Sequence, residues 1–318
     1  MNSISRTALA GALCIAATAV AAQESTTIRV SSIPIIDTAP LQVAIQKGYF
    51  EEVGLNVDTT PTAGGAVGLP ALAAGAVQIA FSNSVSIALG VAQGLDFQVI
   101  AAGSFTADEA PDIAGIVAKS GSGIASGADL EGKRLAVNTR NNIIWLYAKA
   151  WVDATGGDAD SVTYLEVPFP QMLDAVAGDQ VDAAFLVDPF FTAGTSSGAV
   201  ELVGWPYNAI QPQIPVGMYA TTESYLAENP EVIANFVSAY NKAVDWANDN
   251  AGTDEWAEIV ASYTRLTPDR LSDLQILPFF KTIDPDRLQP TLDLMVDYDL
   301  LRSPIEAADM LHDTVTAQ

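Results

Sequence analysis

DLEGKRLAVNTRNNIIWLYAKAW, residues 129–151, is the stretch that decides how the rest of the chain is interpreted. Leu135 to Val137 is a short apolar run that predicts a buried strand, and the polar run after it predicts a turn. Beyond the turn, apolar residues recur at helical spacing as far as Trp151. Strand, polar loop and helix in this order are typical of an α/β sheet, where the carboxyl end of the strand and the amino end of the helix face one cleft.

The polar loop in this stretch is a candidate binding site for a small anionic or polar ligand. It consists of Asn138, Thr139, Arg140, Asn141 and Asn142. Thr139 and Asn142 can also cap the following helix. Arg140 can form a paired hydrogen bond with a carboxylate or sulfonate, or it can pair with a surface acid. Both roles of Arg140 stay open, and we favour contact with the ligand.

The N-terminal residues have the pattern of a secretory signal peptide. Arg6 precedes a run of small and apolar residues from Ala8 to Ala19, and small residues continue to Ala22. We expect residues 1–22 to be removed on export to the periplasm. No later segment approaches the roughly 20 apolar residues that a membrane-spanning helix needs, so we expect no direct membrane insertion.

Composition excludes several classes of function. The chain has 38 acidic and 14 basic side chains, a formal net charge of −24, and such a surface repels nucleic acid. Cys14 is the sole cysteine and lies in the predicted signal peptide, while the sole histidine, His312, is far from every predicted strand end. Without a cysteine in the predicted mature chain, a histidine pair or a Ser-His-Asp set, the sequence offers no obvious apparatus for metal or nucleophilic chemistry, so we expect no metal site, no cofactor and no enzymatic activity.

A second polar cluster follows a strand in the N-terminal part of the chain. Val77–Phe81 predicts a strand, and Ser82, Asn83 and Ser84 stand at its carboxyl end before a helix over 85–93. These three residues can cap the helix, and they can also bind a ligand. Because the two roles are compatible, we expect at least one of the three to bind.

Acidic residues also stand near predicted strand ends. Asp37 and Thr38 lie in the loop after the first strand, and Asp37 either caps the next helix or faces the cleft. A cleft-facing carboxylate would favour a ligand that carries an amine or a ring N–H. Asp188 follows a later strand and is a candidate partner for Arg140 across the cleft.

Aromatic residues near the predicted loops are candidates for contact with the body of the ligand. Most large aromatic side chains belong to the core, so only a minority should line a cleft. Trp145 and Phe190 would allow a flat or apolar ligand body to stack. The set near loops comprises Phe105, Trp145, Phe169, Phe190, Trp205 and Tyr207.

The order of predicted elements gives two α/β lobes. Lobe 1 takes residues 28–117 and 216–318, and lobe 2 takes residues 118–215, with the first crossing near Ala118. Four pairs of a capping residue and a proline predict helix starts in the C-terminal part, which we expect to pack on lobe 1. These pairs are Asn229-Pro230, Thr267-Pro268, Asp284-Pro285 and Ser303-Pro304.

Four segments carry a resemblance to a known family. They are APLQVAIQKGYFEEVGLNV, PALAAGAVQIAFSNS, DLEGKRLAV and AVAGDQVDAAFLVDPF. In this order they resemble the substrate-binding proteins of bacterial ABC importers in the sulfonate, taurine, nitrate and thiamine-pyrimidine group. The resemblance implies a type II periplasmic binding fold that closes on a ligand between its lobes. It also implies delivery of the ligand to a membrane permease. We expect the protein to be a monomer. Relatives often use small hydroxyl residues where residues 138–142 lie, and Arg140 departs from that pattern.

We therefore expect an extracytoplasmic binding protein for a small organic anion, either a sulfonate or a carboxylate, or for a heteroaromatic compound. Two alternatives remain open. One is an enzyme on the same fold, related to the thiamine-pyrimidine synthases, although those use an active-site histidine and a cysteine-rich segment that this chain lacks. The other is an exported sensor that presents its ligand-bound state to a membrane receptor.

Overall fold

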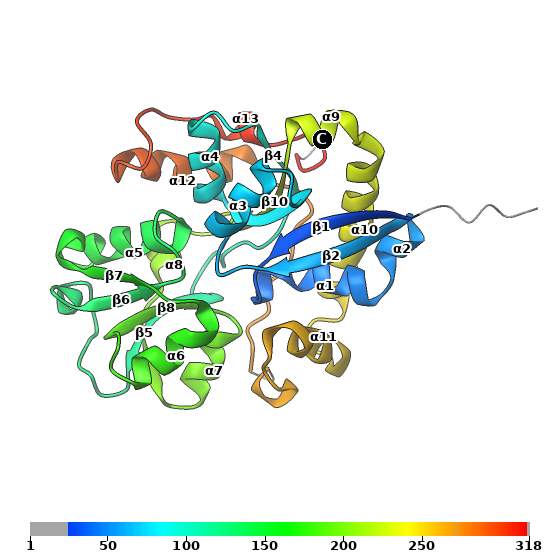
Figure 1. Ribbon diagram of the computed structural model, residues 1–318. Helices are drawn as coiled ribbons and strands as arrows, with labels where there is room; N and C mark the ends of the chain where they lie inside the picture. Colours follow the sequence, from blue (N-terminus) through cyan, green and yellow to red (C-terminus); the bar gives the residue numbers. More distant parts are fainter. Residues whose placement is uncertain (1–24, 272, 317–318) are drawn as a thin grey trace, which may run out of the picture.

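Two five-stranded sheets organise the computed structural model, which describes residues 25–271 and 273–316 (Figure 1). Their strand orders are β2-β1-β3-β10-β4 and β7-β6-β8-β5-β9. In each sheet, three parallel strands are followed by an antiparallel strand that separates them from the edge strand. The two sheets therefore share one topology, and the prediction of two α/β lobes is confirmed.

The first sheet is covered by helices on both faces, which agrees with the continuous apolar character of its central strands. Strands β3 and β10 are buried along their whole length. The strands are β1 (Thr26–Ser32), β2 (Leu55–Pro61), β3 (Ile79–Asn83), β4 (Phe97–Ala102) and β10 (Gly217–Thr222). The nearby helices are α1 (Ala39–Gln46), α2 (Tyr49–Glu52), α3 (Gly65–Ala73) and α4 (Ser84–Ala92).

The second sheet is built in the same way around the stretch from residue 129 to residue 151. The predicted strand and helix form as β6 (Arg134–Val137) and α5 (Ile143–Ala154). The other strands are β5 (Ala114–Lys119), β7 (Thr163–Glu166), β8 (Ala183–Val187) and β9 (Val200–Gly204). The remaining helices are α6 (Phe169–Ala177), α7 (Phe190–Ser196) and α8 (Pro206–Ile210).

The position of β5 corrects the predicted crossing. Ala114–Lys119 pairs with β8 and β9, so it belongs to the second sheet, whereas the sequence placed the crossing near Ala118. A buried apolar strand does not reveal from the sequence which sheet it joins. We therefore propose that lobe 1 ends after β4 and that lobe 2 extends from β5 to β9.

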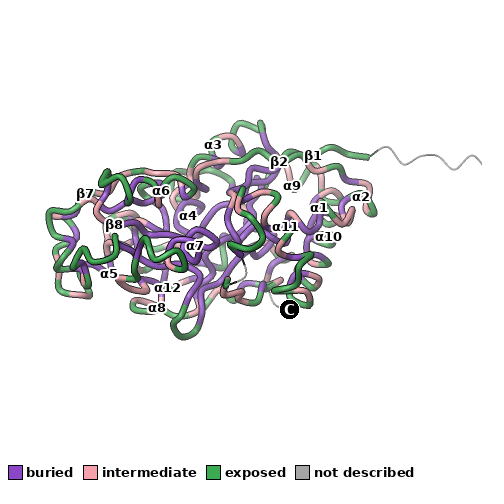
Figure 2. Tube along the Cα trace, turned by 90° about the horizontal axis from the view of Figure 1, so that it is seen from below, coloured by how far each residue is buried: buried purple, intermediate pink, exposed green. Residues whose placement is uncertain are grey.

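Two segments join the lobes, residues 103–113 and 205–216, and they run side by side. Thr106 N–H donates to the Ile214 carbonyl at 3.1 Å, and Val216 N–H donates to the Ser104 carbonyl at 2.9 Å. This pairing makes the connection a two-stranded hinge. Buried residues continue from the cores of both lobes through the junction between them (Figure 2).

The C-terminal part is helical, and its helix α10 packs on the first lobe. Phe236 of α10 stacks on Phe50 of α2 with ring centroids 5.2 Å apart. The helices are α9 (Glu223–Glu228), α10 (Pro230–Asp249), α11 (Asp254–Thr264), α12 (Pro285–Asp297) and α13 (Ala307–Met310). None of the helices within the described ranges is long and apolar enough to cross a bilayer.

Only two of the four cap and proline pairs begin an α-helix. Asn229-Pro230 precedes α10, and Asp284 caps α12 by accepting from Asp286 N–H at 3.0 Å. Thr267-Pro268 begins a single 3-10 turn, and the helix expected to start at Ser303-Pro304 does not form there. After the turn at Thr267 the chain runs toward the hinge, where Gln275 Nε2 donates to the Pro111 carbonyl at 2.9 Å. The predicted signal peptide, residues 1–22, lies outside the described residues.

Candidate functional site

A cavity lies between the two lobes, at the carboxyl ends of β1, β3 and β8. Its volume is about 30 Å³. Its polar wall consists of Asp37, Ser82, Asn83, Asn138, Asn142 and Tyr207. Its apolar wall consists of Ile33, Ile35, Phe81, Ile113, Ala114, Ile143, Ile144, Phe169, Val187, Val216 and Gly217. Five of the predicted site residues therefore meet at one cavity, and they come from both lobes.

The cluster after β3 divides its three side chains between two tasks. Asn83 caps α4, because its Oδ1 accepts from Ser86 N–H at 3.0 Å. The same oxygen accepts from Ile143 N–H of the second lobe at 3.2 Å, so one side chain joins the amino ends of α4 and α5. Ser82 lines the cavity, while Ser84 is buried and does not. The hydroxyl of Ser82 has no hydrogen-bond partner within the described part of the chain.

The loop after β6 is also largely satisfied by its own hydrogen bonds. Asn142 caps α5 through Trp145 N–H at 3.0 Å and donates to Asn138 Oδ1 at 2.7 Å. Asn138 Nδ2 donates in turn to the Ala63 carbonyl of the first lobe at 3.4 Å. The amide donors at the amino ends of α4 and α5 are thus largely occupied by asparagine side chains. These helix ends offer little to an anionic head group.

Thr139 faces the first lobe and stands outside the cavity. Its hydroxyl is buried without a partner among the residues that the structure describes. A Cβ atom at Gly64 would lie 3.0 Å from Thr139 Cγ2 and 2.8 Å from Asn138 Nδ2. The lobes therefore approach each other closely at Gly64, and a larger residue there would have to displace the side chains of Asn138 and Thr139.

Three predicted residues of the second lobe point away from the cavity. Arg140 and Asn141 are exposed, and Arg140 N–H donates to Glu166 Oε1 at 2.7 Å. Trp145 is half-buried and lies edge-on to Tyr164, with ring centroids 6.0 Å apart. Asn138 and Asn142 line the cavity, whereas Arg140 and Asn141 between them are exposed. Trp145 follows on the outer face of α5, where the sequence pattern alone does not fix the rotation of the helix.

Thr38, Asp188 and Phe190 are buried but do not line the cavity. The Thr38 hydroxyl donates to the carbonyl of Ile33 at 2.9 Å and so stabilises its own loop. Asp188 Oδ1 accepts from Thr192 N–H at 2.9 Å and fixes the start of α7. The ion pair between Asp188 and Arg140 that the sequence left open is not among those that the described residues form.

Three buried carboxyl groups gather at the hinge side of the cavity, and sequence reasoning missed one of them, Asp112. Burial raises the pKa of Asp37 to about 6, against a hydrogen bond from the Ser104 hydroxyl that lowers it. Burial raises the pKa of Asp112 to about 6 as well. Burial raises the pKa of Asp188 to about 7, and the charges of Asp37 and Asp112 add to this effect.

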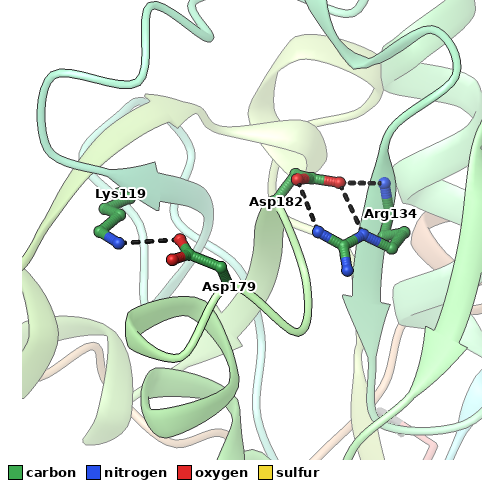
Figure 3. Close-up of polar contacts among 4 residues, drawn as sticks. All are labelled: Lys119, Arg134, Asp179 and Asp182. Atoms are coloured by element: carbon green, nitrogen blue, oxygen red, sulfur yellow. Dashed lines mark hydrogen bonds and ion pairs between the residues drawn. The ribbon is translucent and has the colours of Figure 1, made fainter.

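Basic side chains are placed elsewhere. No lysine, arginine or histidine is among the described residues that line the cavity. In the second lobe, Arg134 pairs with Asp182 at 2.9 Å, and Lys119 pairs with Asp179 at 2.8 Å (Figure 3). Arg134 begins β6, and Asp182 directly precedes β8, so this pair lies at the end of the sheet opposite the cavity. The cavity is therefore acidic on its polar side.

The aromatic wall of the cavity differs from the one expected. Phe81, Phe169 and Tyr207 line it, whereas Trp145 and Phe190 do not. Tyr207 is buried, its hydroxyl has no partner within residues 25–271 and 273–316, and burial raises its pKa well above the usual value. Its ring packs edge-on against Tyr147 at 4.9 Å between centroids. Phe169 and Tyr207 are two of the aromatic residues that the sequence placed near predicted loops, whereas Phe81 was not among them.

Residues 35–252 match the profile of the family described as NMT1/THI5 like. The chain belongs to this NMT1/THI5-like family. Among its curated relatives, a Bacillus subtilis (strain 168) protein assigned as an aliphatic sulfonates-binding protein is 24% identical over 277 residues, which cover 85% of this chain and 77% of that protein. The formylaminopyrimidine-binding protein of Halalkalibacterium halodurans is 25% identical over 66% of this chain and 62% of its own length.

The fold of this NMT1/THI5-like chain is similar to that of a solved structure. The alkanesulfonate-binding protein SsuA from Xanthomonas axonopodis pv. citri, bound to MOPS, superposes with a TM-score of 0.77. It is 18% identical, over 91% of this chain and 99% of that one. The type II periplasmic binding fold and the family resemblance inferred from the sequence are confirmed.

Proposed function

We propose that this protein is the extracytoplasmic solute-binding component of an ABC importer and delivers its ligand to a membrane permease. The proposal rests on one observation, a cavity that both lobes line and that carries three buried polar atoms without partners among the described residues. These atoms are Asp37 Oδ2, Ser82 Oγ and Tyr207 Oη. Buried polar atoms of this kind are nearly always hydrogen-bonded in proteins, so a ligand is the natural partner.

The chemistry of the wall favours a heteroaromatic ligand over an organic anion. The apolar residues from both lobes suit a flat body, and Phe81, Phe169 and Tyr207 supply ring surfaces. The Asp37 carboxylate accepts hydrogen bonds, and the hydroxyls of Ser82 and Tyr207 can donate or accept. A sulfonate or carboxylate would meet Asp37 with no basic side chain in the described wall to offset the repulsion. Of the relatives named above, the formylaminopyrimidine-binding protein has a ligand name that fits this chemistry.

The contacts between the lobes support a capture mechanism by closure. Asn83 reaches Ile143 at 3.2 Å, and Ile36 N–H donates to the Asp188 carbonyl at 2.9 Å, so both ends of the cavity are bridged. The cavity volume of about 30 Å³ is too small for an aromatic ring, so a ligand can enter only when these bonds open and the walls move apart. A ligand that contacts both walls then stabilises the closed arrangement, because it binds that state better than the open one.

A thermal-shift screen of the exported protein tests the proposal. The library contains aminopyrimidines and other N-heteroaromatic compounds, aromatic carboxylates, and aliphatic and aromatic sulfonates. We expect N-heteroaromatic compounds to raise the melting temperature, because a ligand that binds only the folded state stabilises it. Each hit is then incubated with the protein and recovered for mass spectrometry. Recovery of unchanged compound supports a binding protein, and conversion to a product would support the enzyme alternative instead.

A further inference from the structure

Three buried carboxylates from different parts of the fold lie close enough to interact beside the cavity, and one of them, Asp37, lines it. Asp37 comes from the first lobe, Asp112 from the first hinge segment and Asp188 from the second lobe, and their exposed fractions are 2%, 1% and 0%. Backbone hydrogen bonds hold these parts together. Ile36 N–H donates to the Asp188 carbonyl at 2.9 Å, and Asp188 N–H donates to the Ile113 carbonyl at 2.8 Å.

Each of the three carboxylates is only half satisfied. Asp112 Oδ1 accepts from the N–H groups of Ala107 and Ile113 at 3.1 and 2.8 Å, and Asp188 Oδ1 accepts from Thr192 N–H at 2.9 Å. The second oxygen of all three is buried without a partner within the described ranges. An ionised carboxylate in such a place costs several kcal/mol unless an opposite charge reaches it.

Within residues 25–271 and 273–316, no basic side chain pairs with the cluster. The ion pairs found among the described residues involve none of these acids. The same part of the chain also contains no group of three or more acidic, histidine or cysteine side chains arranged to hold a metal ion. The missing charge is therefore better matched by an organic cation than by a metal.

We propose that the ligand carries a cationic nitrogen, such as a primary ammonium, an amidinium or a protonated ring nitrogen, and that Asp37 binds it. This inference rests on the proposed function. Asp37 is the one member of the cluster that lines the cavity, and its free Oδ2 shares that wall with Tyr207 and Ser82. A cation there also lowers the repulsion that Asp37 exerts on Asp112 and Asp188, which belong to the hinge and to the opposite lobe.

The charge of the ligand then selects the closed state. In the closed arrangement, Asp37 and Asp188 share a buried junction, so their mutual repulsion is strongest there. Opening the cleft would let water reach these groups and relieve the repulsion. A cationic ligand reduces the same repulsion while the cleft stays closed. Its preference for the closed state over the open state is therefore stronger than that of a neutral ligand of equal shape.

Sets of probe compounds with one shared body and three charges test the inference. The bodies are benzyl, pyridylmethyl and 2-methyl-4-aminopyrimidinylmethyl, each as the primary amine, the alcohol and the carboxylate. Affinities are measured by calorimetry at pH 7.5 for the wild type, for Asp37→Asn and for Asp58→Asn. Asp58 is exposed on β2, so its variant removes one negative charge away from the site.

On the wild type, we expect the best amine to bind at least tenfold more tightly than its matched alcohol, and the carboxylate to bind more weakly still. Asp37→Asn should abolish the advantage of the amine and leave the alcohol within threefold, while Asp58→Asn should change neither. An advantage of the alcohol or carboxylate over the amine on the wild type would overturn the cationic ligand and leave the binding function intact. Failure of every probe and of the whole screening library to bind would instead overturn the proposed function. The ranking on the wild type decides the inference even if Asp37→Asn does not fold.

Discussion

The two ends of the cavity differ in how far the protein satisfies its own polar groups. At the end formed by α4 and α5, Asn83, Asn138 and Asn142 bond to helix amides, to each other and across the cleft. At the hinge end, Asp37 and Tyr207 keep buried oxygens without partners among the described residues. The end at α4 and α5 therefore holds the lobes together, and the hinge end keeps free oxygens that a ligand can bind.

The largest effect is expected from blocking the approach of the lobes. Gly64→Val keeps an extended backbone that any residue adopts, since φ is −176° and ψ is 162°. Its added atoms would enter the space of Asn138 and Thr139, because even a Cβ would lie 2.8 Å from Asn138 Nδ2. Calorimetry with the best ligand should show affinity reduced roughly 30-fold or more, since the closed state becomes a minor population.

A glycine in the second lobe provides the control for that experiment. Gly178→Ala places a Cβ 3.2 Å from the carbonyl of Asp174 within the same lobe. It should leave ligand affinity within twofold of the wild type. Equal affinities for Gly64→Val and the wild type would show that close approach at Gly64 is not needed for binding.

The second effect separates helix capping from contact between the lobes. Asn83→Ala removes the cap of α4 and also the bond to Ile143 N–H across the cleft. The free energy of unfolding should fall by about 1 kcal/mol, as it does when other helix caps are removed. Ligand affinity should fall several-fold. Chemical denaturation and calorimetry measure the two quantities.

Thr253→Ala is the matched control for the asparagine. Thr253 caps α11 by accepting from Trp256 N–H at 3.3 Å and lies outside the cavity wall. Its loss should reduce stability by about the same amount and leave affinity unchanged. A similar loss of affinity in both variants would mean that Asn83 acts only as a cap.

The third effect concerns the acidic end and depends on pH. The folded-state pKa of Asp188 is about 7, above the ordinary value of 3.8, so the fold favours the protonated form. The stability that this group contributes is present below about pH 4 and is lost as pH rises through about 7. Asp188→Asn should therefore increase the free energy of unfolding at pH 7.5 by about 1 kcal/mol, which raises the melting temperature by roughly 2–4 °C. At pH 4.5 the substitution should not raise the melting temperature.

Asp58→Asn again serves as the comparison, because it removes an exposed charge of the same sign. Melting curves of both variants across pH 4.5–8 isolate the contribution of Asp188 from those of the other acids. Parallel curves for Asp188→Asn and the wild type over this range would contradict a raised pKa for Asp188.

The smallest effect is expected at the residue that the sequence favoured most. Arg140→Ala should change ligand affinity by less than twofold, because Arg140 is exposed and outside the cavity wall. Calorimetry on this variant checks the placement directly. A loss of tenfold or more would restore the sequence hypothesis that Arg140 binds an anionic group.

Local patterns predicted much of the site and failed where orientation mattered. Apolar spacing predicted the strand, turn and helix around residues 134–154, and Asn142 caps the helix as a residue of its type should. The pattern could not tell that Asn138 and Asn142 face the cleft while Arg140 and Trp145 face away. Side-chain direction in a loop depends on backbone angles that the sequence does not display, such as the positive φ of 54° at Asn141.

Long-range contacts explain the other differences. Sequence reasoning missed Asp112 because one acid in a hinge segment has no periodic pattern. It becomes part of a cluster only when β5 inserts into the second sheet and brings Ile113 beside Asp188.

Local periodicity and composition were enough to predict the two α/β lobes, the polar clusters at strand ends and the strong excess of acids. Which polar groups satisfy one another, and which remain free at the cavity, depends on contacts between distant parts of the folded chain. Hydrogen-bond partners such as Asn83 and Ile143 lie 60 residues apart in the chain, and their pairing exists only when both lobes are folded and in contact.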